Sequence, residues 1–227
     1  IREKAFKEYG VNLKGASQAI IEFNKKLIDA VYDLVPAVKP QLAYYEMYGV
    51  EGIKAFEETC KYAKNKGLLV IADGKRNDIG TTAEAYSKAF LGDTILTGEI
   101  REKAFDVDAL TVSPYLGIDG IKPFIDDCNN NSKGIFILVK TSNKSSGQLQ
   151  DLVTQDCRSI YEIMAAYVNE WGKNVRGKYG YSSVGAVVGA TYPNQAKLLR
   201  SIMKHAYILV PGYGAQGGTA KDCAHSF

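Results

Sequence analysis

The chain has 227 residues, is 46% hydrophobic and 23% charged, and carries a formal net charge of +3. This ordinary globular composition can bury a sizeable core, and the near-neutral charge offers no basic surface for nucleic acid or an anionic membrane. No apolar run approaches the roughly 18 residues of a membrane-spanning helix, and the charged opening IREKAFKEYG does not resemble a signal peptide.

The first predicted element is a helix over residues 16–35. Apolar residues recur there every three or four positions, and Pro36 cannot continue the helix. Short apolar runs then alternate with segments of helical periodicity. The predicted strands are residues 38–44, 68–72, 109–113, 134–139, 184–188 and 207–210. The further predicted helices are residues 50–66, 82–91, 117–128, 156–171 and 193–204, with a last one starting near Thr219.

Strands that alternate with helices predict βαβ units and a parallel sheet, and no linker-like stretch divides the chain. The sequence therefore favours one α/β domain over residues 1–227, built as a (β/α)8 TIM barrel. Eight strands close such a barrel and six are predicted, so we expect the first and last strands to be missing and the domain to be truncated at both ends. The hexapeptide IREKAF occurs at residues 1–6 and 100–105, but its flanks differ, so it is no repeat unit.

Cysteine and histidine usage argues against a disulfide framework and against a metal site. The cysteines lie far apart without a C-x-x-C pair, and the chain has only two histidines. Scattered cysteines of this kind are typical of reduced thiols, so we expect a cytoplasmic protein. The residues concerned are Cys60, Cys128, Cys157, Cys223, His205 and His225.

The strongest candidate site begins with DGKRND at residues 73–78, directly after a predicted strand. Side chains alternate between the two faces of a strand, so Asp73 and Lys75 should point the same way, roughly 7 Å apart. In a barrel this direction can be the interior, at the end where active sites lie. Buried opposite charges are costly unless paired, so the two residues indicate either a structural ion pair at a strand end or a catalytic pair.

Three further segments place polar groups at strand ends. Lys39 lies inside an apolar strand pattern, from which its ammonium group could reach Asp73. The sequence KTSN at residues 140–143 follows another strand, although a plain loop would explain it equally well. The glycines of PGYGAQGG at residues 211–218 can free backbone N–H groups for an anion, as in the phosphate sites of barrels, and a tight loop is the alternative.

Taken together, these motifs resemble those of the orotidine 5′-phosphate decarboxylase family. The chain is most similar to the branch whose core motif reads D-x-K-R-x-D-I-G. The likeness runs from about Gly15 to Asp222, and D-x-K-x-x-D alone is shared with sister barrels that act on sugar phosphates. The motifs that carry it are DGKRNDIGTTAEAY, TVSPYLGIDG, VKTSN, VGATYP and PGYGAQGG.

The resemblance implies four catalytic residues, which are Lys39, Asp73, Lys75 and Asp78. Asp78, with Ile79 and Thr82, would serve the active site of the partner subunit in an obligate homodimer. The implied substrate-binding residues are Gln41 for the ribose, Ser142 for the pyrimidine, Gln216 for base and phosphate, and Gly214 with its neighbours, including Pro211, for the phosphate. The family's Asp on the first strand and its phosphate-binding Arg after the last strand have no counterpart in this sequence.

The implied reaction is the decarboxylation of orotidine 5′-phosphate to uridine 5′-phosphate (UMP), the last step of de novo pyrimidine nucleotide synthesis. The resemblance implies no cofactor and no metal; Lys75 would give a proton to C6, with Asp73 near the substrate carboxylate. Two alternatives stay open. One is a sister barrel that uses Mg²⁺ as a decarboxylase or synthase of keto-sugar phosphates, and the other is a non-catalytic phosphate-binding barrel.

Overall fold

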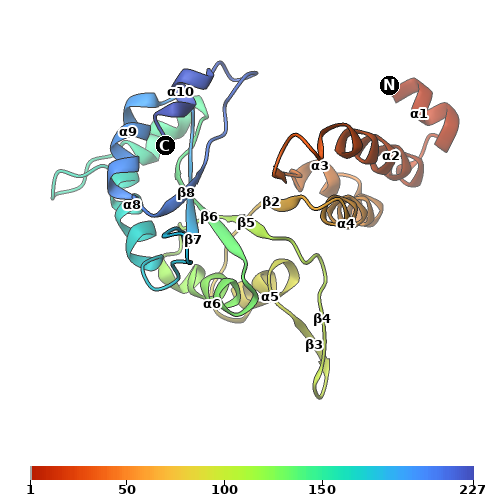
Figure 1. Cartoon of the computed structure of the whole chain (residues 1–227), viewed down its shortest axis with the longest axis horizontal. Helices are drawn as coiled ribbons and strands as arrows, with labels where there is room; N and C mark the ends of the chain where they lie inside the picture. Colours follow the sequence, from red (N-terminus) through yellow and green to blue (C-terminus); the bar gives the residue numbers. More distant parts are fainter. Residues whose placement is uncertain (1) are drawn as a thin grey trace.

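A six-stranded parallel sheet forms the centre of the molecule. The structure is a computed structural model that describes residues 2–227. The strands lie in the order β1-β2-β5-β6-β7-β8, and Figure 1 shows them curling into a half-barrel. Their bounds are Ala37–Val38 (β1), Leu69–Arg76 (β2), Ala109–Val112 (β5), Gly134–Lys140 (β6), Ser182–Val188 (β7) and Ala206–Leu209 (β8). The α/β class and the parallel sheet predicted from the sequence are confirmed.

Helices stand around the outer face of this sheet, with α2 and α4 beside its β1–β2 edge (Figure 1). The longer helices are α1 (Arg2–Tyr9), α2 (Leu13–Val31), α4 (Gly49–Asn65), α5 (Gly80–Phe90), α6 (Lys122–Asn131), α8 (Ile160–Trp171) and α9 (Pro193–Ile202). The short segments are α3 (Ala43–Glu46), η1 (Ile118–Gly120), η2 (Lys144–Ser146), α7 (Gly147–Gln150) and α10 (Ala220–Ala224). Over residues 2–227, none of the helices has both the length and the apolar character that a bilayer crossing requires.

Alternating burial along β2 separates the core from the concave face of the sheet. Val70 and Ala72 are fully buried in the core, whereas Ile71 and Lys75 stay partly or largely accessible. Behind the sheet, Phe56 of α4 is fully buried among the rings of Tyr45, Phe90 and Phe105. Burial of each such side chain contributes about 1.5–3 kcal/mol, so the helices hold β2 firmly from one side and leave its other face for chemistry.

The predicted strand over residues 38–44 is wrong in its extent. Regular strand stops at Val38, and the short helix α3 follows soon after. Pro40 has no N–H for a ladder, yet its carbonyl accepts a hydrogen bond from the N–H of Asp73 at 3.0 Å. The pairing therefore continues irregularly as far as Gln41, which forms an isolated parallel bridge with Asp73. This irregular end of β1 places Gln41 beside the candidate site.

Two helices begin later than the sequence pattern predicts. In the predicted helix 117–128, Gly117 adopts a φ of +74° and the turn η1 comes before α6. In the predicted helix 156–171, the side chains and backbone of Ser159 and Glu162 form a reciprocal capping box that sets the start of α8. The apolar periodicity predicted both helices to start too early. The start of a helix depends on local backbone conformation and capping hydrogen bonds, which periodicity does not report.

The sequence pattern does not predict the antiparallel hairpin of β3 (Thr94–Thr97) and β4 (Ile100–Glu102). The hairpin projects from the body of the molecule (Figure 1) and turns at Gly98, which has a φ of +55°. Its second strand holds the start of the second IREKAF segment, whereas the first copy, described from Arg2 onward, lies in helix α1. The residues REKAF of the first copy are therefore helical, whereas the second copy begins with the three strand residues of β4 and continues outside a regular element.

Candidate active site

A pocket of about 520 Å³ opens where the carboxyl ends of the six strands meet. Every strand of the sheet, or the segment that follows it, contributes to the lining. Active sites of (β/α) barrels lie at this end of the strands. The predicted site residues that line the pocket are Lys39, Gln41, Asp73, Lys75, Ser142, Pro211 and Gln216.

The carboxylate of Asp73 is the centre of the polar network in this pocket. Its Oδ2 accepts hydrogen bonds from Lys39 Nζ at 2.6 Å and Gln41 Nε2 at 2.9 Å. Its Oδ1 accepts from Lys75 Nζ at 2.6 Å and from the hydroxyl of Thr111 at 2.9 Å. Asp73 is only 7% exposed, so this arrangement pairs a nearly buried charge with four donors.

The two ammonium groups keep this carboxyl ionised. Burial by itself raises the pKa of Asp73, because a charged carboxylate loses its hydration. The hydrogen bonds and positive charges of Lys39 and Lys75 more than offset that effect, so the pKa of Asp73 lies below its ordinary value. The side chain of Lys75 is 46% exposed toward the pocket and that of Lys39 is 34% exposed. The site therefore presents an accessible ammonium group held by a buried carboxylate.

The backbone at Lys75 is strained. Its φ of +47° lies in the left-handed region, which is uncommon for residues other than glycine, and the β2–β5 register shifts between Ala72 and Arg76. This irregularity turns the N–H of Lys75 to the hydroxyl of Thr111, which accepts it at 3.0 Å. Thr111 thus contacts both members of the ion pair, and strain of this kind is typical of functional positions.

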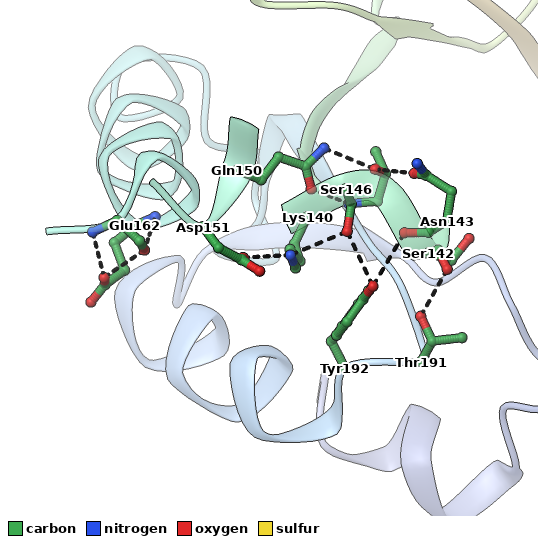
Figure 2. Close-up of polar contacts among 11 residues, drawn as sticks. Lys140, Ser142, Asn143, Ser146, Gln150, Asp151, Glu162, Thr191 and Tyr192 are labelled. Atoms are coloured by element: carbon green, nitrogen blue, oxygen red, sulfur yellow. Dashed lines mark hydrogen bonds and ion pairs between the residues drawn. The ribbon is translucent and has the colours of Figure 1, made fainter. Parts of the chain in front are cut away.

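The segment 141–143 after β6 forms another wall of the pocket. The carbonyl of Ser142 accepts a hydrogen bond from Thr191 Oγ1 at 3.1 Å, one of the contacts drawn in Figure 2. Gly189 approaches so closely that a Cβ there would lie 2.7 Å from Ser142 Cα. Only glycine fits this approach, and the loop after β7 therefore holds Ser142 at the pocket.

The glycine-rich loop after β8 is closed largely by its own hydrogen bonds. The N–H groups of Gly214, Gly217 and Gly218 donate to carbonyls within the loop at 2.8–2.9 Å. In the described part of the chain, the N–H groups of Gly212, Ala215 and Gln216 make no backbone hydrogen bond. This differs from the expectation that the glycines as a group supply free N–H donors. An anion at this loop would meet both N–H groups that are bonded within the loop and N–H groups without a backbone partner.

Four predicted site residues do not line the pocket. Gly214 lies in the glycine-rich loop but outside the lining. Asp78 and Ile79 directly precede α5, and Thr82 lies in its first turn. Asp78 Oδ1 accepts a hydrogen bond from the N–H of Ile79 at 2.8 Å, and Ile79 is 54% exposed. Across residues 2–227, neither a hydrogen bond nor an ion pair joins Asp78 to Lys75. Within one chain, the proposed tetrad is therefore a triad of Lys39, Asp73 and Lys75.

Sequence reasoning missed several residues of the pocket. Thr111 had a weak signal, since it lies within the predicted strand 109–113, but a buried threonine in an apolar strand is usually a core residue. Asn143 was part of a polar set after β6, and Tyr44 was hidden inside a strand prediction that proved too long. These positions become visible only when the strand ends are placed side by side.

The donor set of the pocket is basic. Asp73 is the acidic residue of the lining, and it lies between two ammonium groups. Over the residues that the structure describes, no three His, Cys, Asp or Glu side chains are grouped as ligands of a metal ion.

Known proteins are similar to the chain in both sequence and fold. The model of the orotidine 5′-phosphate decarboxylase / HUMPS family matches residues 18–226. The chain is 50% identical over 203 residues to orotidine 5′-phosphate decarboxylase of Caldicellulosiruptor saccharolyticus, and the match covers 89% of this chain and 66% of that protein. It is 42% identical over 218 residues to the enzyme of Clostridium perfringens, covering 96% of this chain and 72% of that protein. The structure of Leishmania donovani OMP decarboxylase is similar with a TM-score of 0.74 at 34% identity, covering 87% of this chain and 70% of that one.

The chain spans 66% of the length of the Caldicellulosiruptor relative. The matched range contains the ion-paired carboxylate of β2, the segment after β6 and the glycine-rich loop after β8. On this coverage and identity, the chain belongs to the orotidine 5′-phosphate decarboxylase / HUMPS family.

Proposed function

We propose that the chain carries the catalytic centre of an orotidine 5′-phosphate decarboxylase, which converts orotidine 5′-phosphate to UMP and CO₂ without a cofactor. One observation carries the proposal: the carboxylate of Asp73 is held between the ammonium groups of Lys39 and Lys75, at 2.6 Å from each, in the wall of a pocket. Relatives that carry this name include one that is 50% identical to the chain over 203 residues.

The chemistry requires a positive charge at one carbon atom. Loss of CO₂ breaks the bond between C6 and the substrate carboxylate and leaves the electron pair on C6, in an orbital that the pyrimidine ring cannot delocalise. An ammonium group fixed beside C6 stabilises this pair electrostatically. Lys75 would then give its proton to C6, so that UMP gains a C6–H bond and the lysine becomes neutral.

Asp73 would act on the substrate carboxylate and on Lys75 together. Placed near the carboxylate, its negative charge would disfavour the bound substrate relative to the transition state, in which the carboxylate is lost as neutral CO₂. The lowered pKa of Asp73 supports this role, because the residue must stay ionised while it orients Lys75. Lys39 would supply the second positive charge that makes an ionised Asp73 tolerable in a nearly buried position.

The remaining pocket residues would bind the parts of the substrate that do not react. We assign Gln41 to the ribose, Ser142 to the pyrimidine, Gln216 to the base and phosphate, and Pro211 and Gly214 to the phosphate loop. Binding energy at the phosphate can be used to offset desolvation and strain at C6, so this loop should influence turnover as well as affinity.

The proposed enzyme is a homodimer in which Asp78, Ile79 and Thr82 reach the site of the neighbouring subunit. Their position outside the pocket of their own chain supports this arrangement. We also propose that residues 1–227 form one domain, since the sheet is continuous from β1 to β8. A cytoplasmic location is part of the proposal, because all four cysteines are free thiols.

A sister reaction on a keto-sugar phosphate is the nearest enzyme alternative. It needs Mg²⁺ to hold an enediolate, and a single carboxylate already bonded to two lysines is a poor ligand for that ion. The pocket therefore favours the pyrimidine reaction. A barrel that binds phosphate without catalysis is the other alternative, and the experiment below separates all three.

The test is the loss of orotidylate absorbance after addition of the purified chain, measured with and without a chelator. We expect decarboxylation that survives the chelator, and no turnover by Lys75→Ala, which should keep the parental circular dichroism. Activity abolished by the chelator would favour the sister reaction. UMP binding without decarboxylation would favour the non-catalytic barrel, and near-normal turnover by Lys75→Ala would refute the assigned proton donor.

Mixing two inactive variants tests the shared site. Lys75→Ala and Asp78→Ala should each be inactive, but after exchange of subunits half of the dimers carry one intact site. About a quarter of the parental activity should therefore return on mixing. No recovery, with subunit exchange verified by a mass tag, would contradict the dimer assignment and leave the role of Lys75 within its own chain intact.

A further inference from the structure

The buried ammonium group of Lys140 has no role in the proposed reaction. Lys140 is the last residue of β6, and its side chain is 0% exposed. The β6–β7 register shifts between Leu138 and Lys140, so Leu138 lines the pocket while both Val139 and Lys140 are buried. A fully buried charge is costly unless it is well paired, so the partners of this lysine indicate what it does.

Three segments of the chain meet at the Lys140 ammonium group. Nζ lies 2.6 Å from Asp151 Oδ1, donates to Ser146 Oγ at 3.2 Å and lies 4.4 Å from the centre of the Tyr192 ring. Figure 2 shows Asp151, Ser146 and Tyr192 gathered around it. Ser146 ends η2, Asp151 directly follows α7, and Tyr192 lies in the loop after β7. The ammonium group therefore ties two loops to the end of β6.

The same two loops hold the backbone that lines the pocket. Tyr192 Oη donates to the carbonyl of Asn143 at 3.2 Å and accepts from Ser146 Oγ at 3.2 Å. Gln150 Oε1 accepts from the N–H of Thr141 at 3.0 Å, and its Nε2 donates to Thr141 Oγ1 at 2.8 Å. Both ends of the segment 141–143 are thus fastened by residues next to the contacts of Lys140.

We propose that Lys140 is a positioning residue of the pocket. Through Ser146, Asp151 and Tyr192 it sets the place of residues 141–143, and with them the pocket-lining residues Ser142 and Asn143. This inference rests on the proposed function in one respect, that the ligand of the pocket is a pyrimidine nucleotide.

The same strand offers a matched control at its other end. Lys133 directly precedes β6, its side chain is 7% exposed, and its Nζ lies 2.8 Å from Asp106 Oδ1 and 3.5 Å from Asp108 Oδ1. It does not line the pocket. Lys133→Met and Lys140→Met each remove one buried, ion-paired charge beside β6 and keep most of the side-chain volume. Because both variants lose a buried charge, any difference between them in exchange rate or UMP affinity reflects where the lysine lies, at the pocket end of β6 or at the opposite end.

The first measurement is hydrogen exchange of the full chain without any ligand. Lys140→Met should raise the exchange rate of the amides in residues 141–146 by about tenfold or more, and Lys133→Met should leave that segment at the parental rate. Tyr192→Phe is the milder variant, which keeps the ring beside Lys140 and removes only the hydroxyl; we expect about threefold faster exchange in the same segment. If Lys140→Met fails to fold, the exchange rates of Tyr192→Phe decide the test. Parental exchange of residues 141–146 in the folded variants would overturn the proposal, whatever the activity of the parent chain.

The second measurement is UMP affinity by calorimetry. Lys140→Met should bind UMP about tenfold more weakly than the parent, and Lys133→Met within about twofold of it. Equal affinity in Lys140→Met, or an equal loss in both variants, would overturn the positioning role. The parent itself tests the proposed function separately: a parent that binds UMP without decarboxylating orotidine 5′-phosphate contradicts the reaction, while the comparison of the two lysines remains valid.

Discussion

Replacing Thr111 with valine removes one hydroxyl from the centre of the site without changing its shape. The hydroxyl donates to Asp73 Oδ1 at 2.9 Å and accepts from the N–H of Lys75 at 3.0 Å, and the residue is 1% exposed. Valine has nearly the same volume, so it leaves no cavity. The substitution therefore isolates the two hydrogen bonds that connect the carboxylate to the strained backbone of Lys75.

The structure sets the size of the expected effect. A hydrogen bond to a charged group is worth about 1.5–3 kcal/mol, and a neutral one about 1 kcal/mol. The Thr111 hydroxyl makes one hydrogen bond of each kind and is itself buried. We therefore expect Thr111→Val to lower the free energy of unfolding by about 2–4 kcal/mol. For a chain of this size, each kcal/mol lowers the melting temperature by about 2–4 °C. If the substitution also weakens the stabilisation of the transition state by the Lys75 ammonium group by about 1.4 kcal/mol, kcat falls about tenfold.

The assays are thermal unfolding followed by circular dichroism and the orotidylate absorbance assay on the same preparations. Thr111→Ser is the matched control, because it keeps the hydroxyl and removes only the methyl group. It should retain kcat close to the parent, with a modest loss of stability. Parental stability and kcat in Thr111→Val would refute the view that this hydroxyl orders the ion pair, and an equal fall of kcat in both variants would point to packing instead.

Two further predictions concern acid stability and the loop after β8. The pKa of Asp73 and that of Asp106 are lowered in the folded chain, in each case because hydrogen bonds and charges of neighbouring lysines outweigh the effect of burial. Their contributions to stability are therefore complete above the unfolded pKa near 3.8 and are lost as the pH falls below it, so urea unfolding should give constant stability from about pH 7 to 5 and a decline below about pH 4. Asp106→Asn should be less stable than the parent at neutral pH and decline less in acid; the same slope as the parent would contradict this account. Gly218→Ala would place a Cβ 2.6 Å from the Gly212 carbonyl oxygen, so we expect about tenfold weaker UMP binding, whereas in Gly177→Ala, where the nearest atom lies 3.7 Å away, affinity should stay parental.

The ion pair at the end of β2 was predictable because its geometry is local. Residues two apart on a strand point to the same face, and Lys75 Nζ is indeed bonded to Asp73 Oδ1. The approach of Lys39 was predictable for a related reason: consecutive parallel strands end at the same edge of a sheet, and here β1 and β2 are neighbours. Both inferences use only the period of a strand and the topology of a βαβ unit.

Other parts of the site depend on contacts between segments far apart in the sequence. The left-handed backbone of Lys75 follows from a register shift against β5, which no local pattern in DGKRND reports. The support of residues 141–143 comes from Tyr192, about fifty residues later in the chain. Contacts between distant segments depend on packing and hydrogen bonding in the folded sheet. The periodicity of apolar residues therefore could not predict them.

The two IREKAF segments show the difference between what local sequence patterns determine and what contacts between distant segments determine. By itself, the sequence determined that strands alternate with helices, that the sheet is parallel, and which charged residues stand at the end of its second strand. It could not determine that residues 2–6, which belong to the first copy, lie in helix α1 while the second copy begins with strand β4. Local propensities differ by only about 1 kcal/mol per residue or less, and the contacts made by a segment after folding readily outweigh them. Tertiary structure therefore decided the irregular positions, which include the left-handed backbone of Lys75 and the buried place of Lys140 at the end of β6.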